Sequence, residues 1–413
     1  MGRSRNRNYI VTAWLSLVGI GEDGLDGLSP AAQDRLAGAT LVVGGARHLA
    51  LAAPISAPTL RWPSPIEDAI PALLARRGEP TCVLASGDPF WFGVGALLRR
   101  HFAPEEMVCL PAPSAFSLAA ARLGWSLQDC ATISLHGRAL AAIIPHLQPS
   151  AKILALSWDG ATPAALARAL VERGMGRSVL TVCEAMGGAS ERLRTCLAER
   201  FEMTDIAALN TIALEVVAER GARVLPLAAG LPDEYFEHDG QISKRETRAL
   251  TLSALAPRRG ELLWDIGAGS GSIAIEWMLA DPANRAIAVE PKPERAARIG
   301  RNALTLGVPA LLVVEGRAPE ALQGLPPPQA IFVGGGCAPG ALEHYLATLP
   351  PGGRLVVNAV TLETQAELTA AYRRWGGDLT QAGFAHADPV GRFTGWRAAM
   401  PVVQWRIEKP WPV

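Results

Sequence analysis

A glycine-rich segment in the second half of the chain constrains the fold more than any other feature of the sequence. The apolar run Leu262–Ile266 leads directly into glycines at three alternate positions, Gly267, Gly269 and Gly271, and a stretch of helical periodicity follows. Glycine at such a strand-to-helix turn lets a ligand lie against bare backbone, with the N–H groups at the start of the helix pointing toward it. The segment therefore predicts an α/β unit with a ligand site where this strand ends.

The spacing of these glycines indicates which ligand is bound. The dinucleotide fingerprint G-x-G-x-x-G has its third glycine one residue later than Gly271. This chain instead reads D-x-G-x-G-x-G from Asp265, a form that suits S-adenosyl-L-methionine, which has no pyrophosphate. Glu290 closes the next predicted strand roughly 20 residues further on, where an acid can accept hydrogen bonds from both ribose hydroxyls. We predict that S-adenosyl-L-methionine is bound here by Asp265, Gly267, Ala268, Gly269, Ser270, Gly271 and Glu290.

Two later loops fit the same ligand. The segment Glu315–Glu320, with Arg317 and Ala318, follows the third predicted strand, where folds of this kind wall the adenine. Val333–Gly336 follows the fourth strand, next to the place where a methyl group is delivered. Its three glycines offer no side-chain acceptor for a target N–H, which is compatible with a carbon nucleophile. A simple tight turn is the alternative interpretation of these glycines.

The chain is predicted to contain two α/β domains. Periodicity is lost between Gly221 and Gly240, which also carries two prolines, so we place the boundary there and predict domains at 1–225 and 226–413. Apolar runs bounded by glycine alternate with helical stretches on both sides of this boundary, as in α/β layers. The second domain is predicted to have strands at 261–266, 286–290, 311–315, 330–333 and 353–357, and an antiparallel edge hairpin from 379–385 and 401–407.

The first half is predicted to be a sheet-containing domain that divides into two lobes near 145–150. Its predicted strands are 15–19, 40–43, 81–85, 152–156, 178–183 and 211–216, and its helices include 69–77, 114–123 and 162–172.

Three loops of small residues are expected to leave one sheet edge of this half. They are Gly19–Gly24, Ala85–Pro89 and Pro111–Phe116, and together they describe a cleft and a second cofactor site. The segment Ser134–Arg138 adds an imidazole and a guanidinium at a strand exit, which are suited to holding substrate carboxylates, although a solvated loop explains them equally well. The predicted residues are Gly19, Gly21, Ser86, Gly87, Asp88 and Ser114 for the cofactor, with His136 and Arg138 for the substrate.

Composition limits the classes of partner. Lys plus Arg and Asp plus Glu are both 39, so the net charge is zero, which argues against nucleic acid. Only four of those 39 basic residues are lysines, leaving 39 − 4 = 35 arginines, which indicates either a GC-rich genome or a substrate rich in carboxylates. The six cysteines form no C-x-x-C pair, so no metal is expected, and no apolar run is long enough to cross a membrane. We expect a cytoplasmic protein.

The first half resembles the tetrapyrrole methylase family. The resemblance is carried by the loop Gly19–Gly24, by Ser86–Pro89 and by Pro113–Ser114, and it departs from the family at Glu22, where proline is common. The first of these strings, together with Ser134–Arg138, looks most like the branch that acts on precorrin-6.

The second half resembles the decarboxylating precorrin methyltransferases. The matching strings are Gly240–Glu246, the loop Asp265–Gly271, Glu290, Glu315–Glu320 and Gly334–Gly336. Ser243 matches a family position next to bound cofactor. The resemblance implies a two-lobed tetrapyrrole methylase fold followed by a Rossmann-like class I methyltransferase fold, with one S-adenosyl-L-methionine per domain.

The order of the two halves resembles the fused precorrin methyltransferases of cobalamin synthesis. This implies methylation of carbon 5 of precorrin-6Y by the first half, and methylation of carbon 15 with loss of the ring-C acetate carboxyl by the second, to give precorrin-8X. Lys244, Arg245 and Arg317 are then candidates for holding substrate carboxylates, although Lys244 and Arg245 are also typical of an exposed helix start. We expect a homo-oligomer with a small-molecule tetrapyrrole substrate and neither nucleic acid nor membrane as partner.

Three alternatives remain at this point. An RNA methyltransferase is the main one, since both cofactor folds occur in such enzymes, but it would need a basic surface. A dehydrogenase is disfavoured by the glycine spacing. One half could also be an inactive module that binds cofactor without catalysis.

Overall fold

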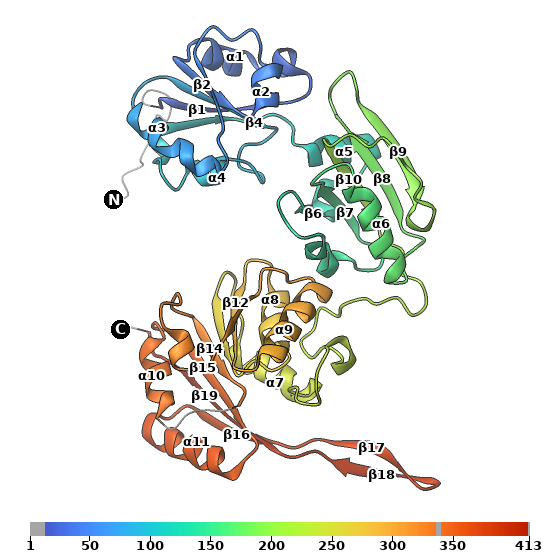
Figure 1. Ribbon diagram of the computed structural model, residues 1–413, viewed down its shortest axis with the longest axis vertical. Coiled ribbons are helices and arrows are strands. Elements are labelled where there is room, and N and C mark those ends of the chain that lie inside the picture. Colours follow the sequence, from blue (N-terminus) through green and yellow to red (C-terminus); the bar gives the residue numbers. More distant parts are fainter. Residues whose placement is uncertain (1–12, 336–339, 412–413) are drawn as a thin grey trace, which may run out of the picture. The chain divides into compact units, whose positions relative to one another are not determined.

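The computed structural model describes residues 13–335 and 340–411. The chain folds into two compact units (Figure 1). The first unit comprises Met1–Leu140 and Gln148–Arg223, and the second comprises Ala141–Leu147 and Val224–Val413. The short segment 141–147 thus lies with the second unit: a Cβ added to Gly307 would lie 2.5 Å from Pro145 Cδ.

The first lobe of the first unit is a parallel sheet in the order β3-β2-β4-β1-β5. The register aligns Ile20 of β1 with Ser86 of β4, and Val18 of β1 with Leu110 of β5, so three strands end at one edge. The elements are β1 (Leu15–Ile20), α1 (Pro30–Ala37), β2 (Leu41–Gly44), α2 (Ala46–Leu51), β3 (Thr59–Arg61), α3 (Ile70–Ala75), β4 (Thr81–Ser86), α4 (Gly95–Leu98) and β5 (Met107–Leu110).

The second lobe is a mostly antiparallel sheet in the order β6-β7-β10-β8-β9, in which only β6 and β7 run parallel. Its elements are α5 (Ala115–Leu123), β6 (Cys130–Ser134), β7 (Lys152–Leu156), α6 (Thr162–Glu172), β8 (Val179–Glu184), β9 (Arg192–Leu197) and β10 (Asn210–Glu215). The predicted division near 145–150 is wrong. The chain leaves the first sheet after β5, because α5 and β6 already belong to the second lobe; β5 and β6 are short, half-buried strands that hydrophobic pattern alone did not reveal.

The second unit is a seven-stranded sheet in the order β13-β12-β11-β14-β15-β19-β16, parallel except for its last two strands. This is the expected Rossmann-like arrangement. The elements are α7 (Arg245–Leu255), β11 (Leu262–Ile266), α8 (Ser272–Ala280), β12 (Arg285–Glu290), α9 (Pro293–Thr305), β13 (Leu312–Glu315), β14 (Ala330–Val333), α10 (Ala341–Thr348), β15 (Arg354–Ala359), α11 (Leu362–Trp375), β16 (Asp378–Ala382), β17 (Ala385–Val390), β18 (Phe393–Ala398) and β19 (Val402–Glu408).

The predicted antiparallel pairing of the last two segments is confirmed, because β16 pairs with β19. They are not joined by a simple turn, however, and β19 lies inside the sheet between β15 and β16. The intervening residues form a separate two-stranded hairpin, β17–β18, which extends away from the seven-stranded sheet (Figure 1).

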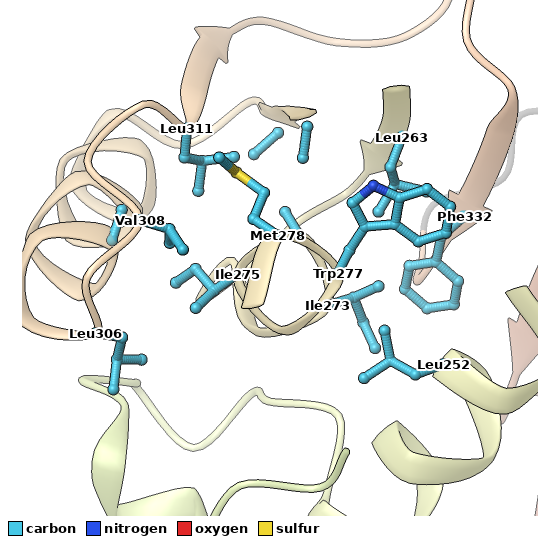
Figure 2. Packing of buried hydrophobic residues seen from close by; sticks show 14 of the residues in the cluster. Leu252, Leu263, Ile273, Ile275, Trp277, Met278, Leu306, Val308, Leu311 and Phe332 are labelled. Carbon is cyan, nitrogen blue, oxygen red and sulfur yellow. The ribbon is translucent and has the colours of Figure 1, made fainter. Parts of the chain in front are cut away.

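The helix after the glycine segment is anchored by burial on nearly all sides. In α8 every residue from Ser272 to Met278 is buried. Figure 2 shows the ring of Trp277 beside the strand residues Leu263 and Phe332, and Met278 pointing toward Leu311; Leu252 of α7 belongs to the same buried cluster. Fully burying a large side chain of this kind contributes about 1.5–3 kcal/mol. The first turn of α8, and with it the preceding loop, is therefore held rigidly.

Candidate cofactor and substrate sites

The glycine loop of the second unit adopts a backbone that its glycines require. Gly267, Gly269 and Gly271 have φ angles of 72°, 62° and 76°. A Cβ on Gly267 would lie 2.7 Å from Gly335 O, and one on Gly271 would lie 2.7 Å from Ile299 Cγ2. At Gly269 the nearest atom to an added Cβ is Gln241 O at 3.7 Å, an ordinary van der Waals distance, so this part of the loop is less crowded. The outer glycines serve the packing of the protein, and the middle one leaves room for a ligand.

Buried polar atoms lie in and beside the glycine loop. Asp265 is fully buried, and its Oδ2 accepts a hydrogen bond of 3.0 Å from Ala274 N–H. Its Oδ1 and the buried Ser270 Oγ have no hydrogen-bond partner among the described residues. Glu290 accepts bonds from the N–H groups of Gly269 (2.9 Å) and Lys292 (3.1 Å). Unsatisfied buried polar atoms are costly, so this donor and acceptor set fits a polar, nucleoside-containing ligand such as S-adenosyl-L-methionine.

Burial raises the pKa of Asp265 to about 7, against the opposing hydrogen bond from Ala274 N–H and with a smaller contribution from the charge of Glu290. An acid with a raised folded-state pKa binds more protons folded than unfolded, so the free energy of unfolding falls as pH rises from about 4 to about 7. We expect Asp265→Asn, which has no such proton, to show a flatter pH dependence by about 1.4 kcal/mol per pH unit in this window. Urea unfolding of both proteins between pH 4.5 and 8 measures this; parallel curves would contradict it.

A strap of chain, residues 237–243, is held beside the loop by α9. The buried Asn302 bonds Glu237 through both main-chain groups, and its Nδ2 also donates to Ser270 O at 2.9 Å. Arg295 donates to Asp239 Oδ2 (2.8 Å) and to Gln241 Oε1 (2.9 Å), and this guanidinium holds the pKa of Asp239 well below its usual range. The strap carries the sequence motif that contains Ser243. Asn302 was not predicted; only its position on the inner face of an amphipathic helix signalled it.

The end of the strap is fixed by a buried ion pair that the sequence analysis did not predict. Arg248 of α7 is fully buried and donates to Glu276 of α8, to Asp233 at 3.1 Å, and to the carbonyl oxygens of Leu231 and Ser243. The main-chain carbonyl of Ser243 is therefore already hydrogen-bonded to Arg248.

The three basic residues predicted to hold substrate in this unit have different settings. Lys244 is exposed, with Nζ 3.5 Å from Asp233 Oδ2, and Arg245 donates to Gly230 O at 3.1 Å. Arg317 is exposed and follows Gly316, whose N–H donates to Glu290 O at 3.1 Å. The structure thus brings Arg317 and its half-buried neighbour Ala318 close to the main chain of Glu290. The side chains of Lys244 and Arg245 instead bind groups outside the glycine loop.

The fourth-strand loop also meets the glycine loop. Gly334 N–H donates to Ile266 O at 3.1 Å, at the carboxyl end of β11. Gly336, the last of the three glycines, lies outside the described residues.

In the first unit the three predicted loops converge. Gly87 N–H donates to Ile20 O (3.3 Å), and Ala112 N–H donates to Gly87 O (3.1 Å). A Cβ on Gly19 would lie 1.9 Å from Gly87 O, so only glycine permits this approach. Gly21 and Asp88 lie in the first two loops, while Ser114 in the third caps α5 by accepting from Ser117 N–H at 3.1 Å. The expectation that they leave one sheet edge is confirmed.

Ser86 belongs to a polar cluster that the sequence analysis did not single out. Its hydroxyl lies 2.6 Å from Arg47 Nη2 and 2.8 Å from His48 Nε2, while Arg47 also pairs with Glu22 of the first loop. Burial, together with the charge of Arg47, lowers the pKa of His48 to about 4. The imidazole is therefore neutral near pH 7, and the Ser86 hydroxyl oxygen accepts a hydrogen bond from Arg47. Glu22, where the chain departs from the tetrapyrrole methylase pattern, is the residue that anchors this cluster.

His136 and Arg138 are both exposed at the end of β6. The His136 ring centroid is 6.2 Å from that of Trp158, and the Arg138 guanidinium carbon is 5.8 Å from the ring centroid of Phe92. Neither makes an ion pair with any residue of the described chain. Both remain available to an anionic ligand.

Two negative findings concern the described residues only. Within 13–335 and 340–411, no group of three or more His, Cys, Asp and Glu side chains could hold a metal ion. No helix in the same part of the chain has the length and hydrophobicity needed to cross a membrane.

Comparisons with known proteins cover nearly the whole chain. Residues 15–202 match the tetrapyrrole (corrin/porphyrin) methylases, and residues 234–409 match the precorrin methyltransferase domain. A Sinorhizobium precorrin-6Y C(5,15)-methyltransferase [decarboxylating] is 57% identical over 98% of this chain and 99% of its own length. A Mycobacterium tuberculosis protein of the same name is 42% identical over 95% of this chain and 99% of its own length.

Among solved structures, the C-terminal domain of precorrin-6Y C5,15-methyltransferase from Rhodobacter capsulatus is 48% identical, with a TM-score of 0.43, covering 45% of this chain and 100% of that domain. These names give no support to an RNA methyltransferase. With two matched domains in one order and full-length relatives of this identity, the chain belongs to the precorrin-6Y C(5,15)-methyltransferase (decarboxylating) family.

Proposed function

We propose that this chain is a bifunctional S-adenosyl-L-methionine-dependent methyltransferase of cobalamin biosynthesis. It methylates carbons 5 and 15 of precorrin-6Y and decarboxylates the ring-C acetate to give precorrin-8X. The observation that carries the proposal is the presence of two unlike sites in one chain: the glycine loop with Asp265 and Glu290, and the converging loops around Gly19 and Gly87. We assign carbon 5 to domain 1–225, and carbon 15 with decarboxylation to domain 226–413.

Each domain is proposed to bind one S-adenosyl-L-methionine, which supplies the electrophilic methyl group when bound. In the second domain Asp265, Gly267, Ala268, Gly269, Ser270, Gly271 and Glu290 hold it, with Ser243, Arg317 and Ala318 beside them. In the first domain the corresponding residues are Gly19, Gly21, Ser86, Gly87, Asp88 and Ser114. The unpartnered Asp265 Oδ1 and Ser270 Oγ support this assignment, since both need a hydrogen-bond partner that the described chain does not provide.

The chemistry requires positioning more than a strong base. An electron-rich bridge carbon attacks the methyl carbon; one carbon–carbon bond forms, the carbon–sulfur bond breaks, and the bridge carbon releases one proton. In the decarboxylation the bond to the acetate carboxyl breaks, its electron pair enters the conjugated ring, and the remaining carbon takes up a proton, leaving a methyl group. Arginine side chains hold the other carboxylates bidentately.

Five basic residues are proposed to make these contacts, namely Lys244, Arg245 and Arg317 in the second domain, and His136 and Arg138 in the first. His136, Arg138 and Arg317 have the stronger support, because each is exposed and makes no ion pair with the described residues. Arg245 is partly committed to Gly230 O, and Lys244 lies near Asp233.

The reaction is tested by the mass of the product. We expect the full chain, given precorrin-6Y and methyl-labelled S-adenosyl-L-methionine, to yield a product that has gained two labelled methyl groups and lost one carbon dioxide in mass spectrometry. A product with one methyl group, or with both methyl groups and the acetate intact, contradicts the proposal.

We further propose a homo-oligomer in the cytoplasm. The hairpin β17–β18 exposes Val390 (63%), Phe393 (68%) and Trp396 (80%), an apolar surface suited to a second copy. The described cysteines are all free thiols, as expected in a reducing compartment. Sedimentation velocity of the full chain tests the oligomer, and a monomer at micromolar concentration contradicts it.

A further inference from the structure

Exposed aromatic side chains lie beside the converging loops of the first unit. Trp91 and Phe92 directly follow the Ser86–Pro89 segment and are each 47% exposed, and Trp158, just after β7, is 55% exposed. The neighbouring Phe116 of α5 is 1% exposed and shows how such rings are normally accommodated. Large rings left in water contribute little to folding, so exposed rings that follow β4 of the first sheet and β7 of the second point to a ligand with an apolar face.

The backbone around Phe92 is strained. Its φ angle is 57°, in the left-handed region that bulky side chains rarely adopt. Main-chain hydrogen bonds close the loop around Phe92: Gly95 N–H donates to Pro89 O at 2.8 Å, and Trp91 N–H donates to Asp88 O at 3.1 Å. A Cβ on Gly93 would lie 2.5 Å from Pro89 O, so only glycine fits at position 93 in this loop. Such strain persists where the surrounding structure holds it for a function.

The two rings are positioned from the second lobe. Both contact the ring of Phe116, with centroid distances of 6.4 Å for Trp91 and 5.8 Å for Phe92. The interplanar angles are 65° and 60°, so Phe116 meets each ring at an angle rather than face to face. About half of the Trp91 and Phe92 side chains stays accessible to solvent. The strained loop and the buried ring of Phe116 set their orientation.

Basic groups accompany the rings. Arg138 lies over Phe92 at 5.8 Å, and His136 lies beside Trp158 at 6.2 Å. Many arginines of this chain pair with carboxylates, as Arg122 does with Glu191, but Arg138 has no such partner in the described chain. A guanidinium stacked on an aromatic ring is oriented in advance, which favours bidentate binding of a carboxylate.

We propose that Trp91, Phe92, Trp158, His136 and Arg138 form an aromatic–basic platform that binds a flat conjugated ring bearing carboxylates at its periphery. The rings contact the face of the macrocycle, and the two basic groups bind its edge. The inference rests on the proposed function and adds to it the side chains that recognise the macrocycle itself. It assigns a role to Trp91, Phe92 and Trp158, which the proposed cofactor site does not use.

Binding of uroporphyrin, a conjugated tetrapyrrole with carboxylates on every ring, tests the platform in the full-length protein. We expect Phe92→Gly to remain folded, because relief of the positive φ offsets part of the lost ring contact with Phe116, and to raise the uroporphyrin Kd about tenfold. Arg138→Met is expected to raise this Kd about tenfold without a change in stability, and Arg138→Lys to recover it only in part. Neither Phe92→Gly nor Arg138→Met should change the Kd for S-adenosyl-L-methionine by more than about twofold, which is the range within which independent sites are additive.

Arg374→Met provides the matched control, since Arg374 stacks on Trp375 at 4.6 Å on helix α11 of the other unit and should leave uroporphyrin binding unchanged. Unchanged Kd values in both platform variants, or no binding by the unmodified protein, overturn the inference. So does a change confined to the sedimentation coefficient, which would place these rings between copies of the chain. If the product mass is wrong but the platform variants lose uroporphyrin, the proposed reaction fails and the platform stands.

Discussion

Replacing Arg248 by methionine is expected to lower the free energy of unfolding of the second unit by about 3–5 kcal/mol. Arg248 is fully buried and its guanidinium donates to Glu276, Asp233 and the carbonyl oxygens of Leu231 and Ser243. Removing it leaves the buried Glu276 carboxyl group without its guanidinium partner, with the backbone N–H groups of Gly230 and Leu231 as its remaining donors. Urea unfolding of the full chain, followed by tryptophan fluorescence, measures the loss.

Arg301→Met is the matched control for this change. Arg301 pairs with Glu237 at 2.8 Å, but both side chains are 54% exposed, so we expect a loss of at most about 1 kcal/mol. Adding Glu276→Leu to Arg248→Met should recover only part of the loss. Glu276 also accepts from the N–H groups of Gly230 and Leu231, and these would remain buried without acceptors. Equal losses from Arg248→Met and Arg301→Met would show that burial of the pair is unimportant.

Gly269→Ala is expected to reduce the number of S-adenosyl-L-methionine molecules bound per chain from two to one. An alanine methyl at this position meets no protein atom closer than 3.7 Å, so the cost to the protein is the strain of the positive φ and not a clash, but the methyl occupies the space beside Glu290 that we assign to the ligand. Overpacking of roughly 1–3 kcal/mol weakens binding by about ten- to a hundredfold. Isothermal titration calorimetry of the full chain measures both sites together.

Gly260→Ala separates ligand exclusion from backbone strain. Gly260 has a φ angle of 80°, and an added Cβ there has nothing within 4 Å, so the strain resembles that at Gly269, whose φ is 62°. We expect two molecules of ligand still to bind. If both variants lose one binding site, backbone strain explains the loss. If Gly269→Ala still binds two molecules with full affinity, the glycine loop is not part of the cofactor site.

Local patterns were sufficient for those parts of the site that lie within one continuous segment. The strand, the alternating glycines and the helix at 262–280 follow directly from apolar periodicity and from the backbone freedom of glycine. The positions of Asp265 and Glu290 beside the glycine loop could be expected from their spacing in the sequence, since neighbouring parallel strands end at one edge; their role in binding stays a prediction. The same reasoning correctly brought together the loops that follow β1, β4 and β5.

Other features depend on which segments meet in space. Asn302 and Glu276 look like ordinary polar positions of helices, and only packing turns the first toward Ser270 and the second toward Arg248. Strand pairing between segments that are distant in sequence places β6 in the second lobe. It also places β19 between β15 and β16 in the seven-stranded sheet.

The sequence alone thus determined the two α/β series, their order, the glycine loop and the family resemblance, because each is encoded by neighbouring residues whose periodicity and spacing have a direct physical meaning. Only the tertiary structure decided which charged groups are buried, which aromatic rings stay exposed and where Phe92 is strained. Burial, pKa and strain are properties of the surroundings of a residue, and those surroundings come from segments distant along the chain.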